Sequence, residues 1–185
     1  LMYLHKNRHT SPFESCNITF NIKMPIFCMR QFVRHRTFRL NEWSGRYSEL
    51  ADEFYVPELW RVQDVKNKQG SLEYIGAGES EEFWHSENTA IAQSVFEAAY
   101  DGYQELLKRG VAKELARVVL PVSMFTEIYI SADVHNLMHF LNLRQDPHAQ
   151  KEIRDIADAM ALVFKELFPW SYEAHTKHKL RMIEV

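Results

Sequence analysis

The sequence is poor in cysteine, glycine and proline, and it lacks any long apolar run. Only Cys16 and Cys28 are present among 185 residues, too few for a disulfide framework or a zinc ribbon. We expect both to be reduced thiols in the core of a cytoplasmic protein. No apolar stretch approaches the roughly 20 residues of a membrane helix, and a mixed polar stretch follows Lys6 and Arg8, unlike a secretory signal.

Charge and composition limit the classes of partner. The formal net charge is −3, with 46% hydrophobic and 25% charged residues. These values are typical of a globular protein with a sizeable core. An acidic chain is a poor general binder of polyanions, so its arginines must act locally. The length favours one domain, which we expect to cover residues 1–185.

Strand and helix patterns follow one another irregularly, which predicts an α+β fold. Apolar and polar residues alternate over 18–24, as in a half-buried strand. Further strands are expected at 53–57 and 125–131, and helices at 25–36, 86–109, 112–120, 134–143 and 147–168. We therefore expect a single domain with a small, mostly antiparallel sheet flanked by long helices.

Local signals mark several boundaries. Ser86 or Asn88 is expected to cap the long central helix, and Gly110 to end it. Asp133 is placed to cap the helix over 134–143. Residues 61–82 are polar and contain glycines, which predicts a surface loop or hairpin. The stretch 76–78, Gly-Ala-Gly, lacks the third glycine and following helix of a dinucleotide-binding fingerprint, so we assign none there.

The stretch 34–47 holds four arginines, a histidine, an acid, an amide and a hydroxyl within fourteen residues. Guanidinium groups suit phosphate because they present paired donors with a permanent charge. Asn41, Glu42 and Ser44 add donors and acceptors for the edge of a base or a sugar. The stretch predicts a site for a small, flat, phosphorylated molecule, and the alternative is a solvated basic loop.

A second polar cluster contains His135, His139, Arg144 and His148. His135 and His139 are four residues apart and share a helical face, a spacing that could bind zinc. However, no glutamate follows His135 and no third ligand is clearly placed. We expect no metal, and a surface pair without a role stays open as an alternative.

The motif Arg-His-Arg, seven residues, then Ser is present as Arg34, His35, Arg36 and Ser44. It resembles the signature of the flavin-dependent thymidylate synthases. Other matching segments are His9 to Glu14, Glu114 to Pro121, and Leu137 to Ile153, so the resemblance runs from about His9 to Trp170.

The resemblance implies an enzyme that makes thymidine monophosphate from deoxyuridine monophosphate. In that family FAD is the cofactor, NADPH reduces it, and methylenetetrahydrofolate supplies the carbon. Arg144 matches an arginine that faces the pyrimidine and favours ionisation of its ring nitrogen, which makes Arg144 the expected catalytic residue.

The remaining site residues follow from the same resemblance. The expected nucleotide-binding residues are Gln31, Arg34, Glu42, Trp43, Ser44, Gly45, Arg46, Arg117 and Arg144. The expected FAD-binding residues are Ser11, Arg34, His35, Arg36, Glu42, Asp133, His135 and His139. Three of these residues also have a purely structural interpretation as an alternative. Gln31 could lie on a solvated helix face, Glu42 could form an ion pair with Arg46, and His35 could be a partly buried residue that forms hydrogen bonds.

Family members are homotetramers whose subunits share active sites, with the arginine that matches Arg117 reaching a neighbour's nucleotide. The sequence agrees in having many aromatic residues near one polar site: Phe27, Phe32, Phe38, Trp43, Tyr47, Phe54 and Tyr55. Aromatic residues are common anchors of interfaces, although a place in the monomer core is at least as good a reading for any one of them.

Three departures from the family pattern stand out. Asp133 and His135 occupy positions where members often carry Asn and Arg toward the flavin, and Trp43 stands where Leu is common. The family's opening segment, with an Ala-Arg-Val-Ser-like stretch near the flavin, is absent before Leu1. An inactive remnant of the enzyme is therefore one alternative. A binder of single-stranded nucleic acid, using arginines interleaved with aromatic residues, is the other.

Overall fold

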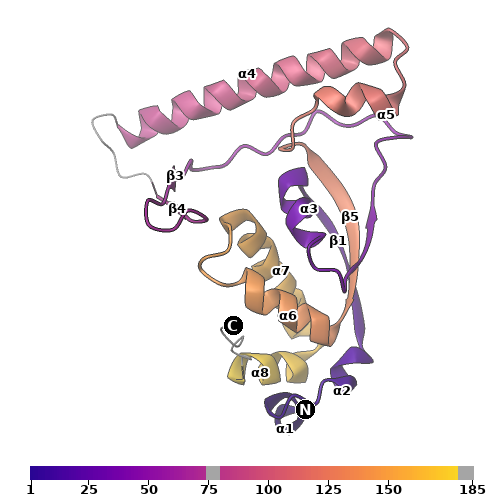
Figure 1. The fold of residues 1–185 in the computed structure, drawn as a ribbon, viewed down its shortest axis with the longest axis vertical. Helices are drawn as coiled ribbons and strands as arrows, with labels where there is room; N and C mark the ends of the chain where they lie inside the picture. The colour runs from indigo at the N-terminus through magenta and orange to yellow at the C-terminus, as the bar shows by residue number, and fades with distance from the viewer. Residues whose placement is uncertain (74–79, 179–185) are drawn as a thin grey trace. The chain divides into compact units, whose positions relative to one another are not determined.

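The computed structural model describes residues 1–73 and 80–178 (Figure 1). The predicted loop over 61–82 therefore lies partly outside the described residues, as does the whole Gly-Ala-Gly stretch. Helices dominate, and the chain forms two compact units that we describe separately. The first contains residues 1–22, 31–41 and 129–178, and the second contains 23–30, 42–73 and 80–128. None of the described helices is both long and apolar enough to cross a membrane.

The main sheet has three strands in the order β1-β5-β2, with β1 at Asn17–Pro25, β2 at Arg39–Glu42 and β5 at Phe125–Asp133. A separate antiparallel hairpin pairs β3, Val62–Gln63, with β4, Ser71–Leu72. The segment expected to be a strand at 53–57 forms only an isolated antiparallel bridge, between Phe54 and Met124. A small antiparallel sheet with long helices confirms the predicted α+β class.

The helices of the first unit pack around an aromatic core. They are α1, Met2–Lys6; α2, Ser11–Glu14; α6, Val134–Arg144; α7, Lys151–Leu167; and α8, Pro169–Lys177. Helix α7 packs against α6 and α8, while α1 packs against α8 (Figure 1). Phe32 and Phe140 are fully buried, and their stacked rings lie 4.9 Å apart. Each such ring removes a large apolar area from water, which stabilises the unit.

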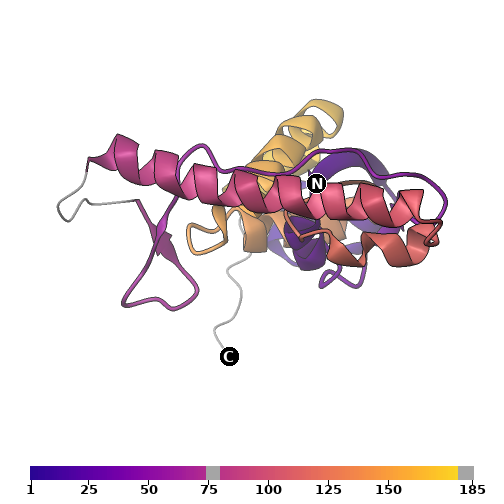
Figure 2. The ribbon, with the colours of Figure 1, turned by 90° about the horizontal axis from the view of Figure 1, so that it is seen from above.

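The second unit is built on α4, Glu81–Lys108, with the short helices α3, Ile26–Phe32, of which only 26–30 belong to this unit, and α5, Lys113–Ala116. Arg117–Val119 forms one turn of 3₁₀ helix, η1. Helix α5 lies beside the C-terminal end of α4 (Figure 1), and the β3–β4 hairpin lies near its N-terminal end (Figure 2). The backbone N–H of Trp60 donates to His85 on α4 over 3.1 Å, which ties the segment before the hairpin to that helix.

Several predicted boundaries were wrong. Helix α4 begins before Ser86, at Glu81, because the Ser80 hydroxyl caps it by accepting from the Phe83 N–H. Helix α3 ends at Phe32 and not at Arg36, since the chain continues in tight turns through Phe38. Helix α7 begins at Lys151 and not at 147.

Other local predictions have mixed outcomes. Asp133 caps α6 as expected, accepting from the Asn136 N–H over 2.8 Å. Gly110 follows the C-cap of α4 with φ +82°, a left-handed conformation that favours glycine. Cys28 is a buried thiol as predicted, but Cys16 is exposed, because it lies at the surface just before β1.

Candidate functional site

Arg144 is the centre of a polar cluster in the first unit. It is the last residue of α6 and is half-buried. Its Nε donates to Nε2 of His35 over 3.0 Å, and its Nη1 donates to Oε1 of Gln31 over 3.3 Å. Nη2 also donates to the Gln31 carbonyl over 3.4 Å. These bonds fix the plane of the guanidinium, which a single contact would leave free to rotate.

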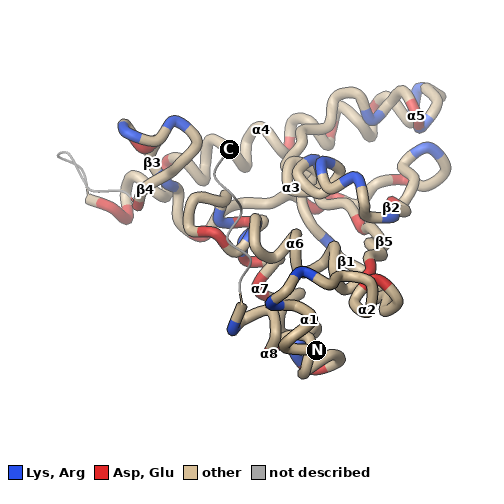
Figure 3. The backbone as a smooth tube through the Cα atoms, turned by 60° about the horizontal axis from the view of Figure 1, so that its bottom comes forward, with Lys and Arg blue, Asp and Glu red and all other residues tan. Residues whose placement is uncertain are grey.

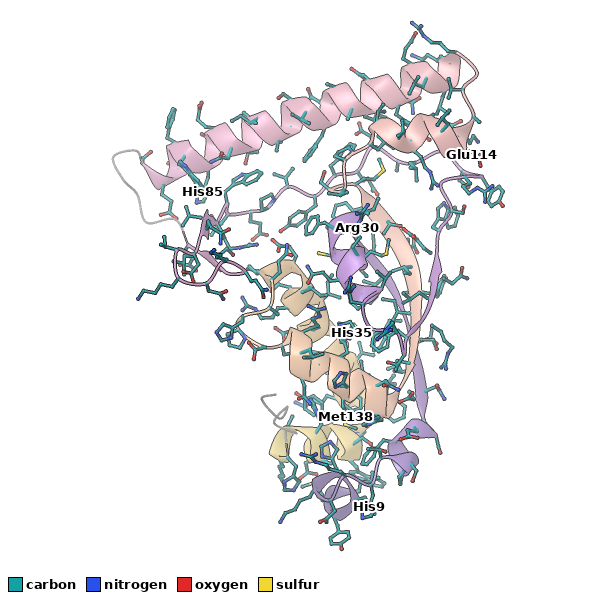
Figure 4. The ribbon with its side chains drawn as sticks, in the orientation of Figure 1. His9, Arg30, His35, His85, Glu114 and Met138 are labelled. Carbon is teal, nitrogen blue, oxygen red and sulfur yellow. The ribbon has the colours of Figure 1, made fainter. Side chains whose placement is uncertain are left out.

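His35 is held in this cluster by aromatic neighbours. Its ring lies edge-on to Phe140 at 4.9 Å and tilted over Phe38 at 5.7 Å between centroids. Figure 4 shows it in the loop that follows α3, close to α6. Burial, followed by the charges of Arg144 and His139, lowers the pKa of His35 to about 4. The ring is therefore neutral at pH 7, and its Nε2 can accept the Arg144 hydrogen bond.

The Arg144 guanidinium is positive without a paired carboxylate. Its three hydrogen-bond acceptors are an imidazole, a side-chain amide and a backbone carbonyl. No acidic side chain of residues 1–73 or 80–178 pairs with it directly. Burial lowers its pKa from the ordinary value, as expected for a cation partly removed from water. The arrangement leaves a fixed, half-buried charge able to attract an anion.

The residues expected around a flavin, apart from Glu42, also lie in the first unit. Arg34 and Arg36 follow α3 in the turns, and both are exposed. The described part of the chain gives their side chains no hydrogen bond or ion pair, so both guanidinium groups are open to a ligand. Two such groups are the donors that a dinucleotide pyrophosphate needs. The donor set therefore fits FAD.

The other flavin candidates differ in how accessible they are. Ser11, the first residue of α2, and His139 on α6 are exposed, while His135 is half-buried. Asp133 already uses both carboxylate oxygens, since Oδ1 accepts from the Asn136 N–H and Oδ2 from its side-chain amide. Its first role in this fold is the helix cap, and contact with a flavin stays a prediction for all four residues.

The second unit contains the other part of the predicted motif. Glu42 ends β2, and its Oε1 accepts from the Thr126 hydroxyl over 2.7 Å. The Trp43 N–H donates to the Glu127 carbonyl over 2.8 Å, while the indole is 63% exposed. The Ser44 hydroxyl accepts from the Arg46 N–H over 3.3 Å, which tightens the turn. A Cβ added at Gly45 would lie 3.0 Å from Cδ2 of Leu50, so a larger residue here requires the Leu50 side chain to move.

Arg46 and Arg117 meet at one acidic residue. Nε and Nη2 of Arg46 both lie 3.1 Å from Oε2 of Glu114, and Arg117 Nε donates to the Glu114 carbonyl over 3.3 Å. Glu114 lies on α5 (Figure 4). Two arginines that are far apart in sequence therefore converge on one short helix. Figure 3 shows that acidic and basic residues are interspersed along the chain, so such local pairs are in keeping with its small net charge.

Sequence reasoning missed four residues of these clusters. Glu114 was hidden because its partner Arg46 is distant in sequence, and its contact with Arg117 is through the backbone carbonyl, which side-chain spacing does not predict. Thr126 was read only as part of a strand. Gln150 and Glu152 were seen only as part of a matching segment, yet they extend the Arg144 cluster. In the described residues no group of three or more His, Cys, Asp or Glu side chains could hold a metal ion.

Comparison with known proteins identifies the family of this chain. The family model described as thymidylate synthase complementing protein matches residues 1–170. The flavin-dependent thymidylate synthase of Kosmotoga olearia is 46% identical over 174 residues, covering 94% of this chain and 74% of that protein. The protein of the same name from Thermus thermophilus is 48% identical over 178 residues, covering 96% of this chain and 63% of that protein. The chain therefore spans about two thirds to three quarters of these relatives.

A solved structure is similar over nearly the whole chain. It is the UMP/dUMP methylase PolB from Streptomyces cacaoi, bound with 5-Br UMP. The TM-score is 0.87 at 37% identity, and the match covers 96% of this chain and 80% of PolB. The family resemblance read from the Arg-His-Arg motif is thus confirmed, together with its enzyme class. The chain belongs to the flavin-dependent thymidylate synthase family.

Proposed function

We propose that this protein catalyses the FAD-dependent reductive methylation of deoxyuridine monophosphate to thymidine monophosphate, with methylenetetrahydrofolate as carbon donor and NADPH as reductant. The observation that carries the proposal is the Arg144 guanidinium, which is oriented by His35 and Gln31 and has no paired carboxylate among the described residues. Such a preorganised charge stabilises negative charge that develops on a uracil ring. Family membership supports the same reaction class.

A bound, reduced flavin would supply the hydride, so the protein itself would bind the reactants, orient them and polarise the uracil ring. Arg144 lowers the cost of ionising the ring nitrogen, and neutral His35 keeps the guanidinium in its plane. Arg34 and Arg36 offer open guanidinium groups for phosphates, and we assign FAD-binding roles also to Ser11, His35, Glu42, Asp133, His135 and His139. The nucleotide-binding set is Gln31, Arg34, Glu42, Trp43, Ser44, Gly45, Arg46, Arg117 and Arg144.

Ser44 is assigned to substrate binding, without a covalent intermediate. In the second unit its hydroxyl accepts from the Arg46 N–H and shapes a turn, which is a positioning role. A Ser44→Ala protein is expected to keep flavin-dependent turnover while binding nucleotide more weakly. Complete loss of turnover with normal nucleotide binding would instead identify Ser44 as a reacting group.

The sugar of the substrate is a second question. The similar structure is named a UMP/dUMP methylase. Uridine monophosphate is therefore an alternative to deoxyuridine monophosphate as the substrate of this chain. Both nucleotides share the uracil ring and the phosphate. They differ at the 2′ position, so the two must be assayed side by side.

We also propose that the protein acts as a homo-oligomer, in the family's tetrameric form, with active sites shared between subunits. Trp43 and Tyr47 beside the motif are 63% and 75% exposed in the single chain. Ile91 and Val95 on α4 are also largely exposed. Large exposed apolar groups such as these favour an interface with another subunit.

The decisive experiment follows the flavin and the product together. Purified protein with added FAD is expected to show a flavin absorbance band that NADPH bleaches. Adding deoxyuridine monophosphate and methylenetetrahydrofolate should then yield thymidine monophosphate. Nucleotide binding without product would point to the inactive remnant. Tight, steeply salt-dependent binding of single-stranded DNA, with weak binding of the mononucleotide, would favour the nucleic-acid binder.

A further inference from the structure

The Arg144 cluster extends through two glutamines to a buried acid. Gln31 accepts from Arg144 Nη1 over 3.3 Å, and its own Nε2 donates to Oε1 of Gln150 over 2.6 Å. Nε2 of Gln150 donates to Oε2 of Glu152 over 2.9 Å. Glu152, on the first turn of α7, is only 8% exposed. We call this chain, Arg144-Gln31-Gln150-Glu152, the amide relay; all four residues lie in the first unit.

The chemistry of its two ends gives the relay a direction. A guanidinium only donates hydrogen bonds, and an ionised carboxylate only accepts them. Each glutamine between them has a donating NH₂ at one side and an accepting oxygen at the other. With a donor-only group at one end and an acceptor-only group at the other, both amides satisfy all three bonds in a single orientation. That orientation is the one observed, with each oxygen facing Arg144 and each NH₂ facing Glu152.

We propose that Glu152 and Gln150 are positioning residues for the reaction, because they fix the amide of Gln31 with its oxygen toward Arg144. This inference rests on the proposed function of Arg144. Without the carboxylate only Arg144 still selects this orientation, so the reversed arrangement, in which Gln31 presents its NH₂ to the guanidinium, becomes less costly. The NH₂ of Gln31 and the guanidinium N–H groups would then repel each other and displace Arg144 from its present orientation. Glu152 thus influences the substrate only through Gln150, Gln31 and Arg144. Because two glutamines separate Glu152 from Arg144 in the relay, the carboxylate orients the guanidinium without pairing with its charge.

The test is Glu152→Gln, which keeps the shape of the side chain and removes its acceptor-only character. Asp158→Asn is the matched control, because Asp158 is also on α7 and also accepts from a glutamine amide, that of Gln145, over 2.8 Å. We expect Glu152→Gln to lower kcat about 3- to 10-fold, the typical value of a displaced hydrogen bond, with a smaller change in KM. The control should stay within about twofold of wild type.

A cycle with Arg144→Gln separates positioning from general stability. If Glu152 acts through Arg144, adding Glu152→Gln to the Arg144→Gln protein should cause no further loss. Equal effects of Glu152→Gln and its control, or losses that multiply in the double variant, would overturn the proposal. If Glu152→Gln fails to fold, Gln150→Met interrupts the relay at an exposed residue and is assessed by the same cycle.

A second readout does not depend on catalysis. Crystal structures of the nucleotide-free protein should show the bond between Arg144 Nη1 and Gln31 Oε1 in wild type and in Asp158→Asn, and its loss or displacement in Glu152→Gln. An unchanged Arg144 in Glu152→Gln would contradict the relay. Because this readout needs no turnover, it still decides the relay if the protein proves not to methylate deoxyuridine monophosphate.

Discussion

Arg144 in the first unit and Arg46 in the second are held in opposite ways. Arg144 is half-buried and bonded to neutral acceptors on His35 and Gln31. Arg46 is exposed and forms an ion pair with the carboxylate of Glu114. A charge held by neutral groups keeps its full attraction for an anion, whereas a paired charge must first give up its partner. The first arrangement suits catalysis, and the second suits reversible binding of a phosphate.

Removing Arg144 should have the largest effect of any single change. Arg144→Gln is expected to lower kcat by at least about 100-fold, because loss of one preorganised charged donor costs this much in comparable sites. Arg144→Lys retains the charge but loses the planar fork, and should give an intermediate rate. Turnover and deoxyuridine monophosphate affinity are measured on each variant. A rate within about tenfold of wild type for Arg144→Gln would contradict the proposed difference between a catalytic Arg144 and a phosphate-binding Arg46.

Acid should weaken the first cluster through His35. The pKa of His35 is about 4 in the folded protein, against an ordinary value of about 6.5 in the unfolded chain. Between those values the unfolded state binds more protons, so the free energy of unfolding falls as the pH drops through this window. The loss is of the order of 1–3 kcal/mol at about pH 4, reduced by the partial exposure of the ring.

Urea unfolding at several pH values measures this loss. His35→Gln should show less acid dependence than wild type, because the group with the lowered pKa is removed. Identical pH slopes for the wild-type and His35→Gln proteins would show that His35 does not sense acid.

The helix that carries Arg144 depends on its cap. Asp133→Ala removes the side chain that accepts from the Asn136 N–H, and should lower the free energy of unfolding by about 1 kcal/mol. Asp133→Asn keeps a capping oxygen and should cost much less. Thermal unfolding of the three proteins gives the comparison. Equal stability of the alanine and asparagine variants would argue against the cap.

The smallest effect is expected at Arg46. Glu114→Gln removes the carboxylate that Arg46 must leave before it reaches a phosphate. Exposed ion pairs contribute about 0.2–1 kcal/mol, so nucleotide affinity should rise about 1.5- to 5-fold, measured by calorimetry at low salt. The effect should fade as salt is added. A clear loss of affinity would show that Glu114 itself helps to bind the nucleotide.

Local sequence signals predicted much of the fold. Alternation identified β1, and the Asp133 cap identified the start of α6. The stretch 86–109 was correctly predicted to be helical, but the exposure of Ile91 and Val95 could not be predicted, since helical periodicity does not say what covers a face. The end of α3 was missed because apolar spacing continues through Val33, whereas the turns that follow are set by tertiary packing of His35 and Phe38.

Contacts between distant segments were beyond sequence reasoning. Arg144 and Gln31 were each expected at the nucleotide, but the bond between residues 113 positions apart needed the fold. The same holds for Glu114, whose ion pair with Arg46 spans 68 positions. Motifs report which groups are present, and only packing reports which of them keep their charge unpaired.

The most direct test of the Arg144 charge is the pH dependence of binding of 5-fluoro-deoxyuridine monophosphate, whose ring N–H is more acidic because fluorine withdraws electrons. Affinity is measured between about pH 7 and pH 9 for flavin-loaded wild type and Arg144→Gln. If Arg144 stabilises the ring anion, wild-type affinity should rise relative to the variant as the ring ionises. Parallel pH profiles for the two proteins would contradict the account.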